Sequence, residues 1–394
     1  SLMVGASAEP SGDVASIIFA IVLTTILADY VLTLVSSLLN YQALGTAMPA
    51  EFDGVYDPQA YKDSQRYTKA KTVFSLLHGS FDLVVMLSFW LLFDGFELVD
   101  EFVRGALPGD AAATPSLDIG RGLAYMGVLG VAESILGLPW DIYHTFVLEE
   151  KFGFNKTTAK TFVLDKLKAL MLLLLLGAPV MAAILAFFIY TGGAAWWLCW
   201  CFIAAFQVIL MFVAPVWIFP LFNEFTPLPE GELKAAIDAY ASRVGFKYQG
   251  IYQIDGSKRS AHSNAFFTGF GQTKRIALFD TLVAQMETTE LLGVLAHEVG
   301  HEKRGHIVQG IVISLGYTFA LLWIMSLFLS YAPLFAAFSV SHPSVYLGLV
   351  LFQLLFSPVD TFMQVGARLI PSLHAGQPQA PEGSYAHPEP QLVS

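Results

Sequence analysis

KALMLLLLLGAPVMAAILAFFIYTGGAAWWLCWCFIAAFQVILMFVAPVWI, residues 168–218, decides the fold class. The stretch consists of two apolar runs, 168–190 and 194–218, on either side of the short segment TGG. A membrane-spanning helix needs about 20 apolar residues, so each run predicts one span. Both cysteines of the chain, Cys199 and Cys201, lie in the second run, where they are typical of lipid or core packing rather than of a disulfide framework.

The rest of the chain has the same character. Hydrophobic residues make up 55% of the 394 positions and charged residues 13%, whereas soluble domains carry about 25% charged residues. Five more runs predict spans, which lie at 14–39, 73–96, 120–146, 307–331 and 344–367. The run at 120–146 is the weakest, because Glu133, Asp141 and His144 interrupt it. We therefore expect an α-helical polytopic membrane protein with about seven transmembrane helices in a lipid bilayer.

Basic residues predict the orientation of these spans. Of the 21 Lys and Arg residues, 19 lie between spans one and two, three and four, five and six, or after span seven, counting Lys168 at the start of span four. Positive charge marks the cytoplasmic side of a membrane, so we expect the N-terminus outside and residues 219–306 in the cytoplasm. The membrane is then a bacterial inner membrane or one of the endoplasmic reticulum type. The net charge of −11 argues against a nucleic-acid partner.

The spans and the polar segments divide the chain into four parts. Residues 1–218 hold spans one to five with their cytoplasmic loops, and residues 307–366 hold spans six and seven. Residues 219–306 form the one long polar segment, and residues 367–394 form a tail rich in Pro, Gly, Ser and His that we expect to be disordered. Periodicity within the polar segment predicts a small α+β unit. Its expected helices are 231–244 and 287–304, and its expected strands are 249–254, 262–268 and 275–279.

The polar segment ends in LAHEVGHEKRGH, residues 295–306, which contains the pattern H-E-x-x-H. Positions i and i+4 lie on one face of a helix, so His297 and His301 can both direct a ring nitrogen at one metal ion. Glu298 lies about 100° further around the axis, where it suits a general base acting on a water molecule at that ion. His306 is five residues from His301 and off this face, so we interpret it as a surface residue. The alternative is a surface helix with scattered polar residues, or histidines in a transport path.

A strand directly before the expected metal helix has two interpretations. HSNAFFT, residues 262–268, is followed by the turn-forming GFGQT and by RIALF. An exposed strand edge there would hold an extended peptide through its unpaired N–H and C=O groups. The same residues are equally typical of an ordinary buried strand, and the spacing alone leaves both interpretations open.

The segments HSNAFFTGFG, KRIALFDTLV and LAHEVGHEKRGH, in that order, resemble the type I CAAX prenyl proteases. LPWDIYHTFVLEEKFGFNKTT (138–158), IFPLFNEFTPL (218–228) and YQIDGSKRSAHSNA (252–265) resemble further segments of that family, and the likeness runs from about residue 40 to about residue 365. The family consists of gluzincin-like membrane zinc endopeptidases that remove the last three residues from prenylated CAAX proteins. The resemblance implies seven tilted helices around an intramembrane chamber, with the metal site at its cytoplasmic end.

The resemblance also implies roles for individual residues. One Zn²⁺ ion is held by His297 and His301, and Glu298 is the general base. Asn264 and Ala265 contact the substrate strand. The substrate is a peptide or the C-terminus of a prenylated protein, so a membrane zinc metalloendopeptidase is the expected activity.

The C-terminal part departs from the family pattern. The family supplies a third zinc ligand, a glutamate, from an arginine-rich helix after the last span, whereas here residues 370–380 read IPSLHAGQPQA. Catalytic zinc sites use three protein ligands, so the third ligand is unidentified and we expect weak zinc binding. A frameshift or truncation in the coding sequence is one hypothesis for the departure. The alternative to an active protease is a catalytically impaired or inactive homologue with a non-enzymatic membrane role.

Overall fold

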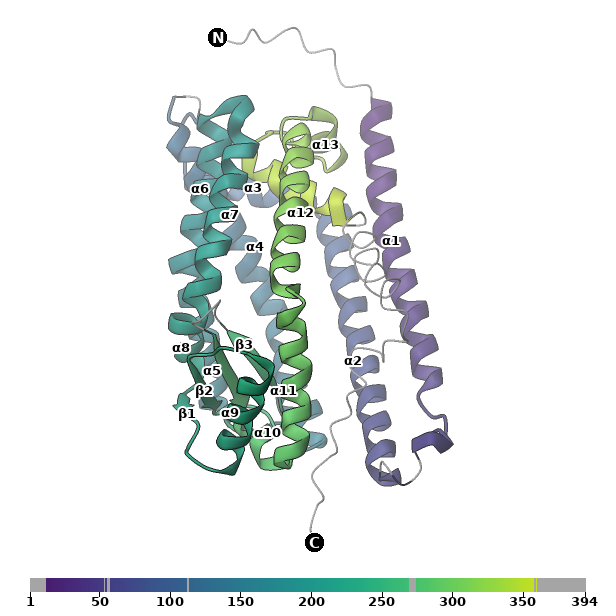
Figure 1. The fold of residues 1–394 in the computed structure, drawn as a ribbon. Coiled ribbons are helices and arrows are strands. Elements are labelled where there is room, and N and C mark those ends of the chain that lie inside the picture. The colour runs from purple at the N-terminus through teal and green to yellow at the C-terminus, as the bar shows by residue number, and fades with distance from the viewer. Residues whose placement is uncertain are drawn as a thin grey trace. The chain divides into compact units, whose positions relative to one another are not determined.

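The computed structural model describes residues 12–357 and residue 359, except residues 53, 55, 56, 112 and 269–273. Long helices form most of this part of the chain, together with one small sheet (Figure 1). The described residues divide into two compact units. Unit 1 holds those within 12–141, 180–196 and 323–359, and unit 2 holds those within 142–179 and 197–322.

Six helical stretches in the described residues are long and apolar enough to cross a membrane. They are Gly12–Ala43, Pro58–Leu91, Pro115–Glu149, Ala159–Tyr190, Gly192–Phe222 and His306–Phe328. Each overlaps one of the first six predicted spans, including the weak third one. The seventh predicted span, 344–367, is described as the shorter apolar helix Val345–Ser357, and most of the residues beyond it lie outside the described part of the chain.

The predicted limits of the second span were wrong. The side chain of Asp57 accepts a backbone N–H in the first turn, so helix α2 (Pro58–Leu91) starts well before the apolar run. After α2, Asp94 takes a left-handed conformation with φ 45°, and α3 (Gly95–Ala106) begins. The predicted span 73–96 therefore contains the end of α2 and the start of α3. Hydropathy did not reveal the break, because the residues on both sides of it are apolar.

Unit 1 is built from helices around one apolar core. Its elements are α1 (Gly12–Ala43), η1 (Ala50–Phe52), α2, α3, α4 (Pro115–Tyr143), most of α6 (Ala178–Tyr190), η4 (Gly192–Ala194), the end of α12, α13 (Ala332–Ala337) and Val345–Ser357. Helix α1 packs against α2 and α13. Tyr125 and Tyr346 are fully buried, with ring centroids 5.5 Å apart, and they lie at the centre of this core.

Unit 2 combines apolar helices with the polar segment. Its helices are η2 (His144–Glu149), α5 (Ala159–Leu172), η3 (Leu173–Gly177), most of α7 (Ala195–Val213), η5 (Ala214–Ile218), α8 (Phe219–Phe222), α9 (Glu232–Val244), η6 (Gly256–Lys258), α10 (Asp280–Gln285), α11 (Thr288–Lys303) and most of α12 (His306–Phe328). The indole N–H of Trp200 donates to the Leu315 carbonyl at 3.0 Å, and the Gln207 amide donates to Ser314 Oγ at 2.9 Å. These two bonds fasten α7 to α12.

The sheet of unit 2 has four strands in the order β1-β2-β4-β3. The strands are β1 (Phe225–Pro227), β2 (Gly250–Ile254), β3 (Ala265–Thr268) and β4 (Arg275–Phe279). Strands β2 and β4 are parallel, whereas β1 and β3 pair antiparallel at the two sides. Ile251, Ile276 and Leu278 are buried in a core shared with Ile237 of α9 and Leu295 of α11.

The polar segment therefore folds as the small α+β unit that was expected. Three predicted strands and both predicted helices are present, with ends that shift by up to three residues. Strand β1 and helix α10 were missed, because three and six residues are too short to show a periodicity. The predicted turn at 269–273 and the tail from residue 367 lie outside the described residues.

Candidate active site

Helix α11 carries the H-E-x-x-H pattern and buries the opposite face. Leu291, Leu295 and Val299 follow one another at intervals of four and are buried in the core of unit 2. His297 and His301 lie two positions further along than Leu295 and Val299, about 200° around the helix axis, and both are exposed. The leucine and valine positions thus fix how α11 is rotated, and that rotation turns the histidines away from the core.

The two histidines converge as the spacing predicts. Nε2 of His297 lies 3.0 Å from Nε2 of His301, and the two ring centroids are 4.6 Å apart. Two nitrogens that ligate one zinc ion in tetrahedral geometry are about 3.3 Å apart. The pair therefore fits two of the ligands of a zinc ion without rearrangement of the helix.

The protonation state of His301 also suits a ligand. Partial desolvation of its ring lowers the pKa of His301 below its usual value, and the neighbouring rings of His297 and His306 lower it further. A histidine must be neutral to ligate a metal. Glu298, half-buried on the same helix, opposes this shift through its negative charge.

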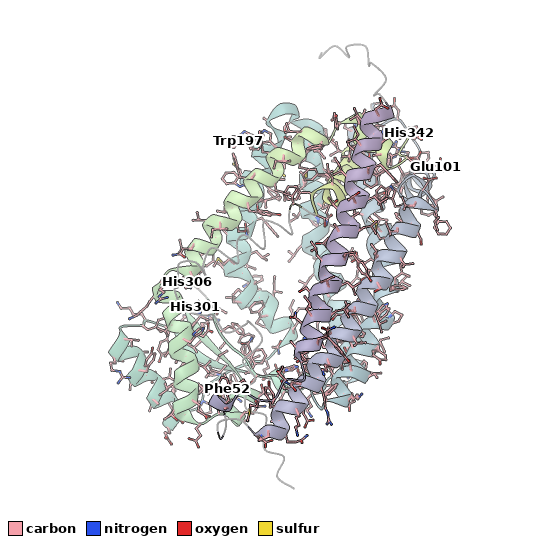
Figure 2. The ribbon with its side chains drawn as sticks, turned by 90° about the vertical axis from the view of Figure 1, so that its right-hand side faces the viewer. Phe52, Glu101, Trp197, His301, His306 and His342 are labelled. Carbon is pink, nitrogen blue, oxygen red and sulfur yellow. The ribbon has the colours of Figure 1, made fainter. Side chains whose placement is uncertain are left out.

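His306 is exposed, as predicted for a surface residue, but the prediction that it lies off the face of the histidine pair is wrong. Nδ1 of His306 lies 2.8 Å from Nδ1 of His301, and the ring centroids are 4.9 Å apart; both side chains are labelled in Figure 2. The reason is that the helix is not continuous. Gly305, with φ 69°, separates α11 from α12, so the five-residue spacing no longer carries His306 around the axis. The signal in the sequence was a glycine directly before the histidine.

Strand β3, which precedes α11 in the sequence, lies at one edge of the sheet. Within the described residues, β3 is hydrogen-bonded to β4 only, and it packs beside α11 (Figure 1). The Asn264 carbonyl accepts the Phe279 N–H at 3.0 Å, so the backbone of Asn264 faces β4. Alternation along a strand then turns the backbone groups of Ala265 and Phe267 outward. Strand β3 is thus an edge strand of the described sheet, and its use to hold an extended peptide stays a prediction.

A polar clamp holds the loop that leads into β3, and sequence reasoning missed it. Arg259 donates to both carboxylate oxygens of Asp165, at 2.7 and 2.9 Å, and this pairing raises the pKa of the guanidinium. Asn155 and Ser260 form an antiparallel bridge, and Nε2 of His262 lies 3.3 Å from a carboxylate oxygen of Glu149. These contacts connect η2, α5 and the loop between them to the segment before β3, more than 90 positions away, which no local pattern in the sequence reveals.

A complete metal site is not found in the described part of the chain. No group of three or more His, Cys, Asp or Glu side chains able to hold a metal ion occurs among the described residues. The residues where a third ligand was sought, 367–394, lie outside them. The donors that are present thus fit part of a zinc site.

Comparison with known proteins assigns the chain to a family. Residues 37–224 match the description "CAAX prenyl protease N-terminal, five membrane helices", and residues 227–368 match "Peptidase family M48". CAAX prenyl protease 1 of Saccharomyces cerevisiae is 36% identical over 365 residues, which cover 86% of this chain and 79% of the relative. The chain belongs to the CAAX prenyl protease 1 family.

Other members and a solved structure agree. The CAAX prenyl protease 1 homologue of Mus musculus is 33% identical over 355 residues, covering 80% of this chain and 74% of the relative. The crystal structure of Ste24p from S. mikatae superposes with a TM-score of 0.81 at 33% identity, over 91% of this chain and 85% of that one. This chain is therefore a multi-pass integral membrane protein of a metallopeptidase family that processes CAAX proteins.

Proposed function

We propose that this CAAX prenyl protease family member is a zinc metalloendopeptidase that cleaves near the C-terminus of prenylated proteins and removes the last three residues. One observation carries the proposal: Nε2 of His297 and Nε2 of His301 converge to 3.0 Å on the exposed face of α11, and an edge strand packs beside that helix. The first arrangement suits a metal ion and the second suits an extended peptide. Together they support a site in which a peptide bond lies next to a metal ion.

The edge strand binds the substrate by adding it to the sheet. The outward backbone groups of Ala265 and Phe267 supply the hydrogen bonds. The Ala265 N–H donates to the side-chain oxygen of Asn264 at 2.8 Å. A substrate carbonyl that took the place of this oxygen would leave the Asn264 amide to contact the peptide.

His297, His301 and Glu298 perform the chemistry. Zinc, when bound, polarises the scissile carbonyl and lowers the pKa of a water molecule. His297 and His301 would hold the ion through Nε2. Glu298 accepts the proton of the attacking water and delivers it to the nitrogen of the departing peptide. Glu298 follows His297 by one residue, about 100° around the helix axis, which suits a base that acts on the water rather than a ligand of the ion.

The hydrolysis of a farnesylated CAAX peptide by the purified full-length protein in nanodiscs tests the proposal. We expect release of the C-terminal tripeptide, loss of that activity with a zinc chelator, and recovery on addition of Zn²⁺. The same peptide without the farnesyl group shows whether the lipid is recognised. His297→Ala is expected to remove both zinc and activity, and an active His297→Ala protein contradicts the proposed site.

A catalytically impaired homologue is the second candidate, and the sequence at 370–380 favours it. Two nitrogens from one helix leave most of the coordination sphere to water, so zinc would be held weakly. Titration of the protein with Zn²⁺ separates the candidates. Tight binding that survives removal of residues 369–394 supports a third ligand upstream and an active enzyme, whereas weak binding and no hydrolysis support the impaired homologue.

We further propose that the polar segment, and with it the site, faces the cytoplasm, because 19 of the 21 basic residues lie on that side of the predicted topology. A bacterial inner membrane and an endoplasmic reticulum membrane both give this orientation. Ser242 is exposed on α9 and suits a probe. We expect Ser242→Cys to react with a membrane-impermeant maleimide only after permeabilisation, and labelling in intact cells contradicts the orientation.

A further inference from the structure

The two ring nitrogens of His301 face two different histidines. Nε2 faces Nε2 of His297 at 3.0 Å, and Nδ1 faces Nδ1 of His306 at 2.8 Å. Both distances are those of hydrogen bonds. His301 is thus the middle ring of three, and its two nitrogens contact different histidines.

The chain reaches this arrangement through the break at Gly305. In a continuous helix, a residue five positions on lies about 140° around the axis from its reference residue. Here α11 ends at Lys303, Gly305 takes φ 69°, and α12 begins at His306. A β-carbon at Gly305 would meet no heavy atom within 4 Å, so the demand for glycine is its backbone conformation and not space. That conformation turns His306 back toward His301.

The chemistry of a ligating histidine assigns the proton in this row. A metal takes the lone pair of Nε2, so the proton of a neutral His301 lies on Nδ1. That N–H needs an acceptor, and Nδ1 of His306 is within 2.8 Å of it. His306 then carries its own proton on Nε2. Metal-ligating histidines regularly donate their second N–H in this way, and the acceptor fixes both the tautomer and the orientation of the ring.

We propose that His306 is a positioning residue whose Nδ1 accepts the Nδ1–H of His301 and so holds His301 in the tautomer and orientation that present Nε2 to zinc. This inference rests on the proposed zinc site. His306 does not itself ligate the ion. Its Nδ1 contacts Nδ1 of His301, on the side of the His301 ring away from the proposed ligand atom Nε2. Its contribution reaches the metal through His301 alone.

Two substitutions separate an acceptor from a ring that merely packs. His306→Phe keeps an aromatic ring against His301 and removes the acceptor. His306→Asn removes the ring and places an amide oxygen where Nδ1 was. His342→Phe, an exposed histidine of unit 1, is the matched control. The affinity for zinc, measured by competition with a chromophoric chelator, and the absorption spectrum of the cobalt-substituted protein are the readouts.

We expect His306→Phe to weaken zinc binding about 10- to 100-fold and to alter the cobalt spectrum, whereas His306→Asn and His342→Phe stay close to the parent. Equal losses in His306→Phe and His306→Asn would overturn the proposal, since they indicate packing or direct ligation. Parent-like affinity in His306→Phe overturns it too. If His306→Phe does not fold, His306→Gly with added imidazole replaces it: recovery of zinc affinity supports the proposal, and no recovery refutes it.

His301→Ala shows which inference has failed. If His301→Ala binds zinc as tightly as the parent, the proposed metal site itself is wrong, and the role of His306 falls with it. If His301→Ala loses zinc while His306→Phe keeps it, the metal site stands and only the role of His306 is withdrawn.

Discussion

Helices α3 and α11 each place two ionisable side chains four positions apart, and they use them in opposite ways. On α3, Asp100 is fully buried and accepts the Arg104 Nε–H at 2.6 Å and the hydroxyl of Tyr346. On α11, His297 and His301 are exposed, and their Nε2 atoms point at one another. The same spacing thus gives a closed network in unit 1 and an open pair of donors in unit 2.

The difference lies in what surrounds each pair. Arg104 also reaches the carbonyl of His342, and Glu97 accepts the Ser341 N–H at 2.9 Å, so α3 is bonded to the segment after α13 along its length. Figure 2 labels Glu101 of α3 and His342, which lie in the same part of the molecule. A buried charged pair whose bonds all end within the protein is costly to break. The two Nε2 atoms on α11 meet instead on an exposed face of the helix.

Glu298→Gln on α11 is the substitution with the largest expected effect. The substitution keeps the shape of the side chain and removes the proposed base, so we expect kcat/KM for a farnesylated CAAX peptide to fall about 10²- to 10⁴-fold. Zinc content and thermal stability should stay at the parent level, because Glu298 is not one of the proposed ligands and surface changes cost little. Glu232→Gln, exposed in the first turn of α9, is the control and should behave as the parent. Unchanged hydrolysis by Glu298→Gln would remove Glu298 from the mechanism.

The converse change is Asp100→Ala on α3. It leaves the Arg104 guanidinium and the Tyr346 hydroxyl without their buried partner, and breaking a buried ion pair costs about 3–5 kcal/mol. Thermal unfolding followed by intrinsic fluorescence should show a large drop in midpoint, while zinc affinity at low temperature is unchanged. Glu101→Ala, exposed on the same helix, should shift stability by less than about 0.5 kcal/mol. A parent-like midpoint for Asp100→Ala would mean that the network is not structural.

The smallest expected effect concerns the clamp on the loop before β3. Arg259→Lys keeps the charge but loses the two-pronged contact with Asp165. Both side chains are 23% exposed, so we expect a loss of about 1 kcal/mol, seen as a several-fold rise in KM with kcat nearly constant. Lys258→Gln, at a more exposed neighbouring position, is the control. A fall in kcat instead of a rise in KM would show that the clamp acts on the chemistry and not on the edge strand.

Local patterns predicted most of the fold. The long apolar runs became helices because length and hydropathy are properties of contiguous residues, and α11 appeared where its periodicity placed it. The H-E-x-x-H geometry followed for the same reason. The four-part division of the chain and the individual roles of the site residues stay predictions.

What the sequence could not give depends on single dihedral angles or on distant partners. His306 was misplaced because its position is decided by the φ of Gly305. The Asp100–Tyr346 bond joins residues 246 positions apart, and Arg259–Asp165 joins residues 94 apart. Such pairings arise only once the helices have packed, so no window along the chain contains both members.

The junction at Gly305 has a consequence for which bond of a membrane-anchored substrate the proposed site can reach. Only Arg304 and Gly305 separate the helix that carries the H-E-x-x-H pattern from α12, which is long and apolar enough to cross a membrane. This short connection keeps the proposed metal site at a nearly constant distance from the expected membrane boundary. In the proposed reaction a lipid-anchored substrate is held at a height of its own by its prenyl group. Cleavage then selects bonds by their distance from the lipid, and flexible residues inserted beside Gly305 should blur that selection before they abolish it.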